Sequence, residues 1–189
     1  MPQAIAEHVG GGPPMGSMDG IRAACERTAS ALTARPAIGQ KTFVTRVLVH
    51  DGLTCDIEEG PWHLTADLPR QLGGQAAGPT PGTFGRAALG SCLAICYVMW
   101  AARLGVPLTN VAVEVHADAD TRGLLGLEEV PAGYTDVRYV VSLTSPAPTE
   151  DIIRVLDTAE VHSPYMDVFR RPHELRRIVR IATTEEETT

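Results

Sequence analysis

The sequence predicts an α+β fold in which antiparallel strands surround one long, buried helix. A proline-free, Ala/Leu-rich segment over residues 84–104 is long enough for a helix that crosses a small domain. Several segments rich in β-branched residues, with apolar and polar side chains in alternation, come before this helix, and more come after it. The predicted strands are therefore grouped, and helices do not separate them one by one. Grouped strands of this kind form antiparallel sheets with helices packed against them, which is the α+β class.

Length and composition indicate one globular domain. The chain has 189 residues, 44% hydrophobic and 21% charged, which is enough for one substantial core. Its formal net charge of −7 argues against a nucleic-acid partner, because no basic stripe is available to neutralise phosphates. The four cysteines lack the paired spacing of a zinc site or of a secreted disulfide framework. We therefore expect neither a metal nor another cofactor.

The two ends of the chain show no periodic pattern. Residues 1–18 are rich in Gly, Pro and Met and predict a disordered arm, and residues 183–189 predict an acidic, frayed tail. The start has neither the basic nor the apolar region of a signal peptide, so the cytoplasm is the expected location. Asp19 predicts the cap of an N-terminal helix over residues 19–35, which Pro36 ends.

A strand meander and a loop are expected before the central helix. Alternating side chains predict three strands, over residues 41–49, 53–58 and 62–66. His50-Asp51-Gly52 and Gly60-Pro61 supply the turns between them, so neighbouring strands are antiparallel. A Gly/Pro-rich loop over residues 68–81 then leads to the helix.

The central helix carries the sharpest chemical feature of the sequence. Thr80 is the expected cap and Pro81 the first helical residue. Apolar residues lie nearly all round the helix, which indicates burial. The uncharged run over residues 87–102 is shorter than the roughly 18 to 20 residues that span a membrane, so no membrane partner is expected. Cys92 and Cys96 are four residues apart and share one face.

The second half of the chain predicts two more strands and two helical segments. Strands are expected over residues 111–117, 137–143 and, as a last strand, 175–181. Thr149 begins a helix that His162-Ser163-Pro164-Tyr165 interrupts, and a short helical piece continues to Phe169. A strongly apolar helix in so short a chain predicts a second subunit to cover it, so we expect a homodimer.

Three places in the chain resemble the OsmC/Ohr group of organic hydroperoxide reductases. Residues 69–75, followed by Thr80-Pro81, resemble the loop before the family's central helix. Ala87-Ala88-Leu89-Gly90-Ser91-Cys92 resembles the helix segment with its peroxidatic cysteine, and Ser163-Pro164-Tyr165 lies where the family has Cys-Pro-Tyr or Cys-Pro-Val. The OsmC-like domain would then span residues 36–182. The resemblance implies an intertwined α+β homodimer with antiparallel sheets around the helix and two active sites at the subunit interface.

The resemblance also implies the roles of individual residues. Cys92 matches the cysteine that attacks the peroxide, while the position of the family's glutamate holds Gly82. The position of the resolving cysteine holds Ser163, which forms no disulfide. The family's arginine lies in the first hairpin, where this chain has His50, with Arg46 as the alternative.

The sequence leaves open what would activate Cys92. Desolvation disfavours the thiolate of a thiol buried among apolar side chains, so a nearby cation or hydrogen-bond donor is needed. The candidates are Arg46, His50, Arg86 and His162. A polar donor beside the sulfur would support thiol chemistry, and a purely hydrocarbon environment would argue against it.

A second thiol for the reaction is also undecided. Cys96 is within the Cα separation of a disulfide, but both side chains are held on one rigid helix, so packing explains it better. Cys55, on a hairpin strand, is a weaker candidate. A small external thiol reductant needs no internal partner.

Three functional hypotheses follow. The first is thiol-dependent reduction of organic hydroperoxides through Cys92, with Ser163 as a hydrogen-bond donor. The second is a binding protein without turnover, whose pocket at the subunit interface holds a small apolar ligand and is lined by Phe84, Met99, Trp100 and Tyr165. The third is a different reaction, with Cys92 and His162 as a nucleophile–base pair. The first is what the resemblance implies.

Overall fold

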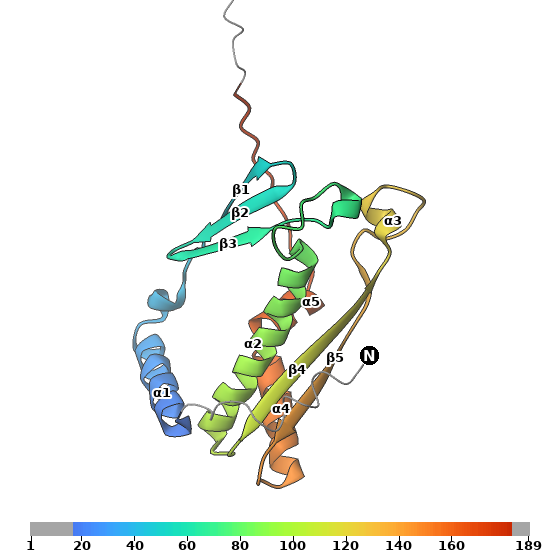
Figure 1. Cartoon of the computed structure of the whole chain (residues 1–189). Helices are drawn as coiled ribbons and strands as arrows, with labels where there is room; N and C mark the ends of the chain where they lie inside the picture. The colour runs from blue at the N-terminus through green and yellow to red at the C-terminus, as the bar shows by residue number, and fades with distance from the viewer. Residues whose placement is uncertain (1–16, 183–189) are drawn as a thin grey trace, which may run out of the picture.

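The computed structural model describes residues 17–182 (Figure 1). Almost all of the predicted arm over residues 1–18 and the whole predicted tail over residues 183–189 lie outside this range. The α+β class is confirmed: a three-stranded and a two-stranded antiparallel sheet lie against helices. The helix α2 runs through the middle of the molecule (Figure 1).

The N-terminal helix α1 (Met18–Ala34) begins one residue before the predicted position. Its cap is Ser17, whose hydroxyl accepts the Gly20 N–H at 3.3 Å, whereas the predicted cap Asp19 lies in the first turn. A serine at this position satisfies an N–H group that the helix leaves free, and an acidic residue in the first turn favours the helix dipole. A short 3₁₀ helix, η1 (Pro36–Gly39), follows, as Pro36 predicts.

Strands β1 (Arg46–Asp51), β2 (Thr54–Glu59) and β3 (Trp62–Ala66) form the predicted meander, in the order β1-β2-β3. The turn between β1 and β2 places Gly52 at a φ of 59°, a conformation that favours glycine. The first strand begins at Arg46, so the prediction of strand from residue 41 was wrong. Arg46 pairs with Glu58, and β2 turns soon afterwards at Gly60, which leaves residues 41–45 without a partner strand.

The helix α2 (Pro81–Leu104) has the predicted limits. The Thr80 hydroxyl accepts the Thr83 N–H at 3.3 Å, Pro81 is the first helical residue, and Gly105 ends the helix at a φ of 73°. Among the described helices, α2 is the one long and apolar enough to cross a membrane by length and composition. The structure packs it against α1, α4, α5 and β4 instead.

The second sheet and the last helices form the other walls of the core. Strands β4 (Asn110–Ala119) and β5 (Tyr134–Thr144) are antiparallel and run along α2, with the short helix α3 (Thr121–Leu124) between them (Figure 1). Helices α4 (Thr149–Val161) and α5 (Pro164–Arg170) pack against α2. One core cluster is formed by residues of α2, α4 and α5: Leu89, Leu93, Cys96, Tyr97, Ala159 and Met166.

The predicted last strand over residues 175–181 is absent from the described chain. The segment pairs with no strand of either sheet, and its apolar side chains are exposed, including Leu175 at 93% and Ile178 at 87%. An isolated extended segment makes no ladder hydrogen bonds, so its β-branched sequence alone does not fix a strand.

Candidate functional site

A buried carboxylate organises the loop that leads into α2. Asp67 is 2% exposed and accepts backbone N–H groups from Leu68 at 2.7 Å, Gln75 at 3.0 Å and Ala77 at 3.0 Å, as well as the Thr54 hydroxyl at 3.2 Å. The hydrogen bond from Ala77 is the largest effect on its pKa, and together with the other donors it lowers that pKa against the opposing effect of burial. Asp67 therefore stays ionised and holds together the loop around the short 3₁₀ helix η2 (Arg70–Leu72).

Two glycines allow this loop to close. A Cβ at Gly74 would lie 1.9 Å from the Leu68 carbonyl oxygen, and one at Gly78 would lie 2.4 Å from that of Thr65. No other residue fits at these contacts without moving the backbone. The loop therefore needs glycine at these two positions for steric reasons.

Cys92 lies in the middle of α2, half-buried, with a polar neighbour. Its Sγ is 3.4 Å from the hydroxyl oxygen of Ser163. Ser163 is 1% exposed and caps α5, where its oxygen accepts the Met166 N–H at 3.4 Å. Because a hydroxyl has two acceptor lone pairs and one proton, Ser163 can accept from Met166 and still donate to the sulfur. The sulfur is therefore not enclosed by hydrocarbon alone.

Cys96, one helical turn after Cys92, belongs to the hydrophobic core. It is 8% exposed, and burial raises the pKa of its thiol to about 11, with the neighbouring Cys92 adding to the effect. At neutral pH Cys96 remains protonated and Cys92 is the thiol nearer the surface. This burial agrees with the prediction that Cys96 is a packing residue and not a disulfide partner of Cys92.

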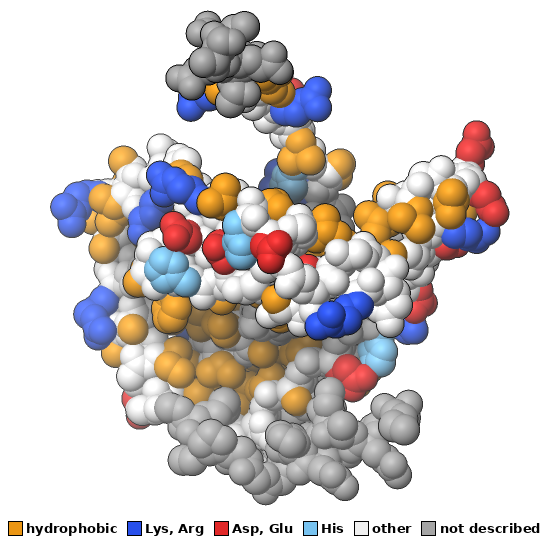
Figure 2. Space-filling model, turned by 45° about the horizontal axis from the view of Figure 1, so that its top comes forward, with side chains coloured by type: hydrophobic (Ala, Val, Ile, Leu, Met, Phe, Trp, Pro, Cys, Tyr) orange, Lys and Arg blue, Asp and Glu red, His pale blue; other side chains and the backbone are white. Residues whose placement is uncertain are grey.

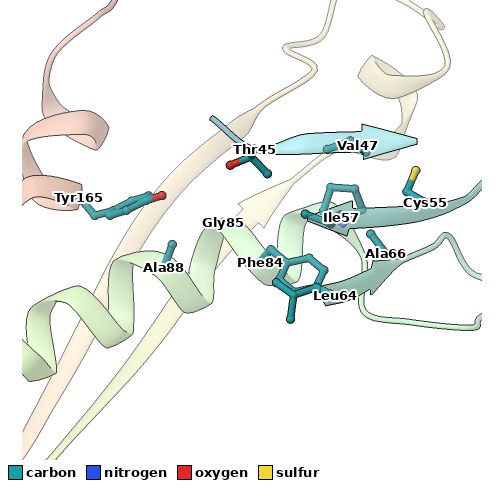
Figure 3. Close-up of a pocket in the computed structure, with 11 residues that line it drawn as sticks. Thr45, Val47, Cys55, Ile57, Leu64, Ala66, Phe84, Gly85, Ala88 and Tyr165 are labelled. Carbon is teal, nitrogen blue, oxygen red and sulfur yellow. The ribbon is translucent and has the colours of Figure 1, made fainter. Parts of the chain in front are cut away.

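An apolar cavity of about 520 Å³ lies at the N-terminal half of α2 (Figure 3). It lies between α2 and the sheet β1-β2-β3, from which Val47, Ile57 and Leu64 line it. Ala88 and Tyr165 lie at one end and Cys55 at the other (Figure 3). Ala88 is one helical turn before Cys92, and Tyr165 follows Ser163 by two residues, so this end of the cavity lies about one helical turn from the thiol pair.

Two predicted activating residues lie on the outer hairpin. His50 is at the tip of β1, with its Nε2 atom 3.3 Å from an oxygen of Asp56. Arg46 lines a different depression, with Asp56 and Glu58. Val47 points into the apolar cavity, and successive side chains of a strand face opposite sides, so Arg46 is directed away from it. The structure does not bring Arg46 or His50 to Cys92.

Arg86, another candidate cation, lies in the first turns of α2 and links them to β5 by a hydrogen bond. Its Nη1 atom donates to the Tyr134 hydroxyl at 3.2 Å, and that hydroxyl donates to the Gly82 carbonyl at 3.0 Å. A Cβ at Gly82, the residue that the resemblance matches to the family's glutamate, would lie 3.2 Å from Arg86 Nη1. Tyr134 comes from β5, so this contact could not be read from the helix sequence.

His162 and Trp100 form a separate aromatic cluster. The two rings stack with centroids 4.8 Å apart, and the Arg103 guanidinium lies 4.0 Å over Trp100. Within residues 17–182 neither His162 nor any arginine hydrogen-bonds the Cys92 sulfur. The hypothesis of a Cys92–His162 nucleophile–base pair gains no support from this placement.

The four predicted pocket residues separate into two groups. Phe84 and Tyr165 line the apolar cavity between α2 and the sheet β1-β2-β3. Met99 lies against α1 in another cavity, and Trp100 packs on the core. Phe84 and Met99 are fifteen residues apart on one helix, or about 22 Å along its axis, which is too far for one small pocket.

These features define an α+β protein with a thiol site where a central helix meets a helix cap, one helical turn from an apolar cavity. The sequence profile of the OsmC-like protein family matches residues 73–176. The chain belongs to this family. The helix α1 and the sheet β1-β2-β3 precede the matched residues.

Solved structures show the same fold at low sequence identity. An OsmC-like protein from Mycoplasma pneumoniae superposes with a TM-score of 0.60 and 14% identity, over 69% of this chain and 89% of its own. An organic hydroperoxide resistance protein from Legionella pneumophila gives 0.52 and 15%, over 69% and 90%. One from Elizabethkingia anophelis, with thiocyanate bound, gives 0.52 and 12%, over 69% and 89%. No curated protein matches the sequence significantly.

Proposed function

We propose that the protein reduces organic hydroperoxides with Cys92 as the attacking thiol. The observation that carries the proposal is the 3.4 Å contact between Cys92 Sγ and the buried Ser163 hydroxyl, one helical turn from an apolar cavity. Family membership and the names of two solved relatives, organic hydroperoxide resistance proteins, support it.

The chain's own groups have defined parts in the reaction. The Cys92 thiolate attacks the terminal oxygen of ROOH; an S–O bond forms, the O–O bond breaks, and RO⁻ leaves as the alcohol after protonation. Cys92 becomes a sulfenic acid and the peroxide is reduced. The Ser163 hydroxyl stabilises the thiolate by donating to it, and the apolar cavity accommodates the organic group R.

An external thiol completes the cycle in this proposal. It condenses with the sulfenic acid to form a mixed disulfide and water, and a second thiol releases Cys92 as a thiol together with the external disulfide. Ser163 forms no disulfide, Cys96 is buried, and Cys55 lies at the far end of the cavity. These placements favour an external reductant over an internal one.

A second candidate function is binding without turnover. Gly82 holds the position of the family's glutamate, and within residues 17–182 no cation hydrogen-bonds Cys92. The apolar cavity would then hold a small apolar ligand between α2 and the sheet. In this alternative Cys92 is a packing residue.

Consumption of cumene hydroperoxide in the presence of excess dithiol separates the two functions. We expect catalytic consumption by the wild-type protein and slower consumption of hydrogen peroxide, because the apolar lining favours an organic group. Saturable binding of the corresponding alcohol, with hydroperoxide loss no faster than without protein, would favour the binding function.

We also propose that the protein is a homodimer. Residues 175–181, which pair with no strand, and the strands β1 to β3 expose large hydrophobic side chains, and hydrophobic side chains gather in a hollow on one face (Figure 2). Contiguous apolar surface of this kind favours association. Sedimentation equilibrium is expected to give twice the 20.2 kDa mass of one chain. A single-chain mass at micromolar concentration would contradict the proposal.

A further inference from the structure

Glu160 is an acidic side chain in an unfavourable helical position. It lies in the last turn of α4, where the partial negative charge of the helix dipole disfavours a carboxylate. Its side chain is only 23% exposed, so water compensates little of that cost. The contacts that it makes inside the protein must therefore account for its stable placement.

The Glu160 carboxylate joins α2 and α5 to α4. The Tyr97 hydroxyl, on α2, donates to one oxygen at 3.1 Å, and Arg170 of α5 lies 3.6 Å from the other. Tyr97 is fully buried. Tyr139 of β5 also interacts with Glu160, since burial and then this carboxylate raise the pKa of Tyr139 to about 12. A buried tyrosine hydroxyl and a guanidinium thus contact one carboxylate.

These contacts are connected through the backbone to both members of the thiol pair. The Glu160 backbone carbonyl accepts the Ser163 N–H at 3.4 Å, so the turn from α4 to Ser163 starts at Glu160. Tyr97 follows Cys92 by five residues on α2. One end of the contact network is therefore tied to the helix of Cys92 and the other to the turn of Ser163.

We propose that Glu160 is a positioning residue that holds the Ser163 hydroxyl against the Cys92 sulfur. The carboxylate fixes the α4–α5 turn to α2 through Tyr97 and to α5 through Arg170, so that the Ser163 oxygen stays within reach of the thiol. Glu160 itself does not touch the reacting atoms. The proposal rests on the proposed function, because the contact that it maintains is the one assigned to thiolate stabilisation.

A double-mutant cycle with Glu160→Ala and Ser163→Ala tests this role. We expect each single variant to lower the rate constant of hydroperoxide reduction by about tenfold, the scale of one lost hydrogen bond to a charged group. The double variant is expected to be no slower than Ser163→Ala alone, because the same contact is already lost. Independent, multiplying losses would overturn the proposal, since a general structural role would also act without Ser163.

Matched variants keep the test independent of folding and of the reductase activity. Glu160→Gln retains an acceptor for Tyr97 and should recover most of the rate, while Glu174→Ala removes an exposed acid and should change nothing. If Glu160→Ala does not fold, Tyr97→Phe replaces it in the cycle, with the same expectation. Iodoacetamide labelling of Cys92 at neutral pH provides a second readout of the same cycle. Lack of hydroperoxide turnover in the wild type with a non-additive labelling cycle would refute the reductase function and support the positioning role.

Discussion

Replacing Cys92 by alanine is expected to reduce the turnover of an organic hydroperoxide by about a thousandfold or more, to the rate without protein. The reason is that the attacking sulfur is the one group in the proposed reaction that forms a bond to the substrate, and loss of a nucleophile removes nearly all catalysis. The measurement is the steady-state consumption of cumene hydroperoxide with excess dithiol.

The other cysteines supply the controls for this result. Cys25→Ala alters a separate cavity between α1 and α2, and Cys55→Ala alters the far end of the apolar cavity. Both variants should retain turnover of the same order as the wild type. Equal activity in Cys92→Ala and the wild type would show that the chemistry lies elsewhere.

Replacing Asp67 by asparagine is expected to lower the urea midpoint of unfolding by roughly 1 M at neutral pH. An amide cannot accept all four hydrogen bonds that the carboxylate receives from Leu68, Gln75, Ala77 and Thr54, and its NH₂ group would face their donors. The exposed Asp136→Asn is a matched control and should change the midpoint little.

The effect of Asp67 has a defined pH dependence. Because the pKa of Asp67 is lowered in the folded protein, its contribution to stability is complete above the unfolded value of about 4 and is lost as the pH falls through the folded value. The difference between wild type and Asp67→Asn should therefore shrink on acidification to about pH 3. A difference that stays constant from neutral pH to acid would contradict the role of the ionised carboxylate.

The parts of the fold that depend on local sequence signals were predictable. Thr80, Pro81 and Gly105 set the limits of α2 because capping and backbone conformation are local properties. The alternation in β4 and β5 likewise reflects one face packed on the core. The last strand over residues 175–181 was predicted by the same alternation, but a strand also needs a partner, which the described chain does not contain.

The site was predictable only where the family resemblance fixed a position. Cys92 and Ser163 are 71 residues apart, and their order in the chain, with the family's two cysteine positions, indicated that they would meet. Ser163, at the position where the resemblance implies a second cysteine, caps α5 and is a polar neighbour of the Cys92 sulfur.

Contacts that combine several elements could not be predicted. The sequence around Asp67 indicates only an ordinary loop residue, because the burial of its side chain depends on how the following loop folds back over it. Glu160 reads as a polar residue of an amphipathic helix, and its partners come from α2, β5 and α5. Met99 and Trp100 were predicted to line a pocket at the subunit interface together with Phe84 and Tyr165, but within one chain their positions late on α2 put them beside α1 and the core.

The central claim is that the Cys92 sulfur attacks the peroxide, and trapping of its sulfenic acid tests this most directly. The protein is mixed with one equivalent of cumene hydroperoxide and excess dimedone, without added thiol, and the adduct is located by peptide mass spectrometry. Sulfenic acid and dimedone join as a thioether with loss of water. The account predicts about one adduct per chain, on Cys92. No adduct, or an adduct confined to Cys25 or Cys55, would contradict it.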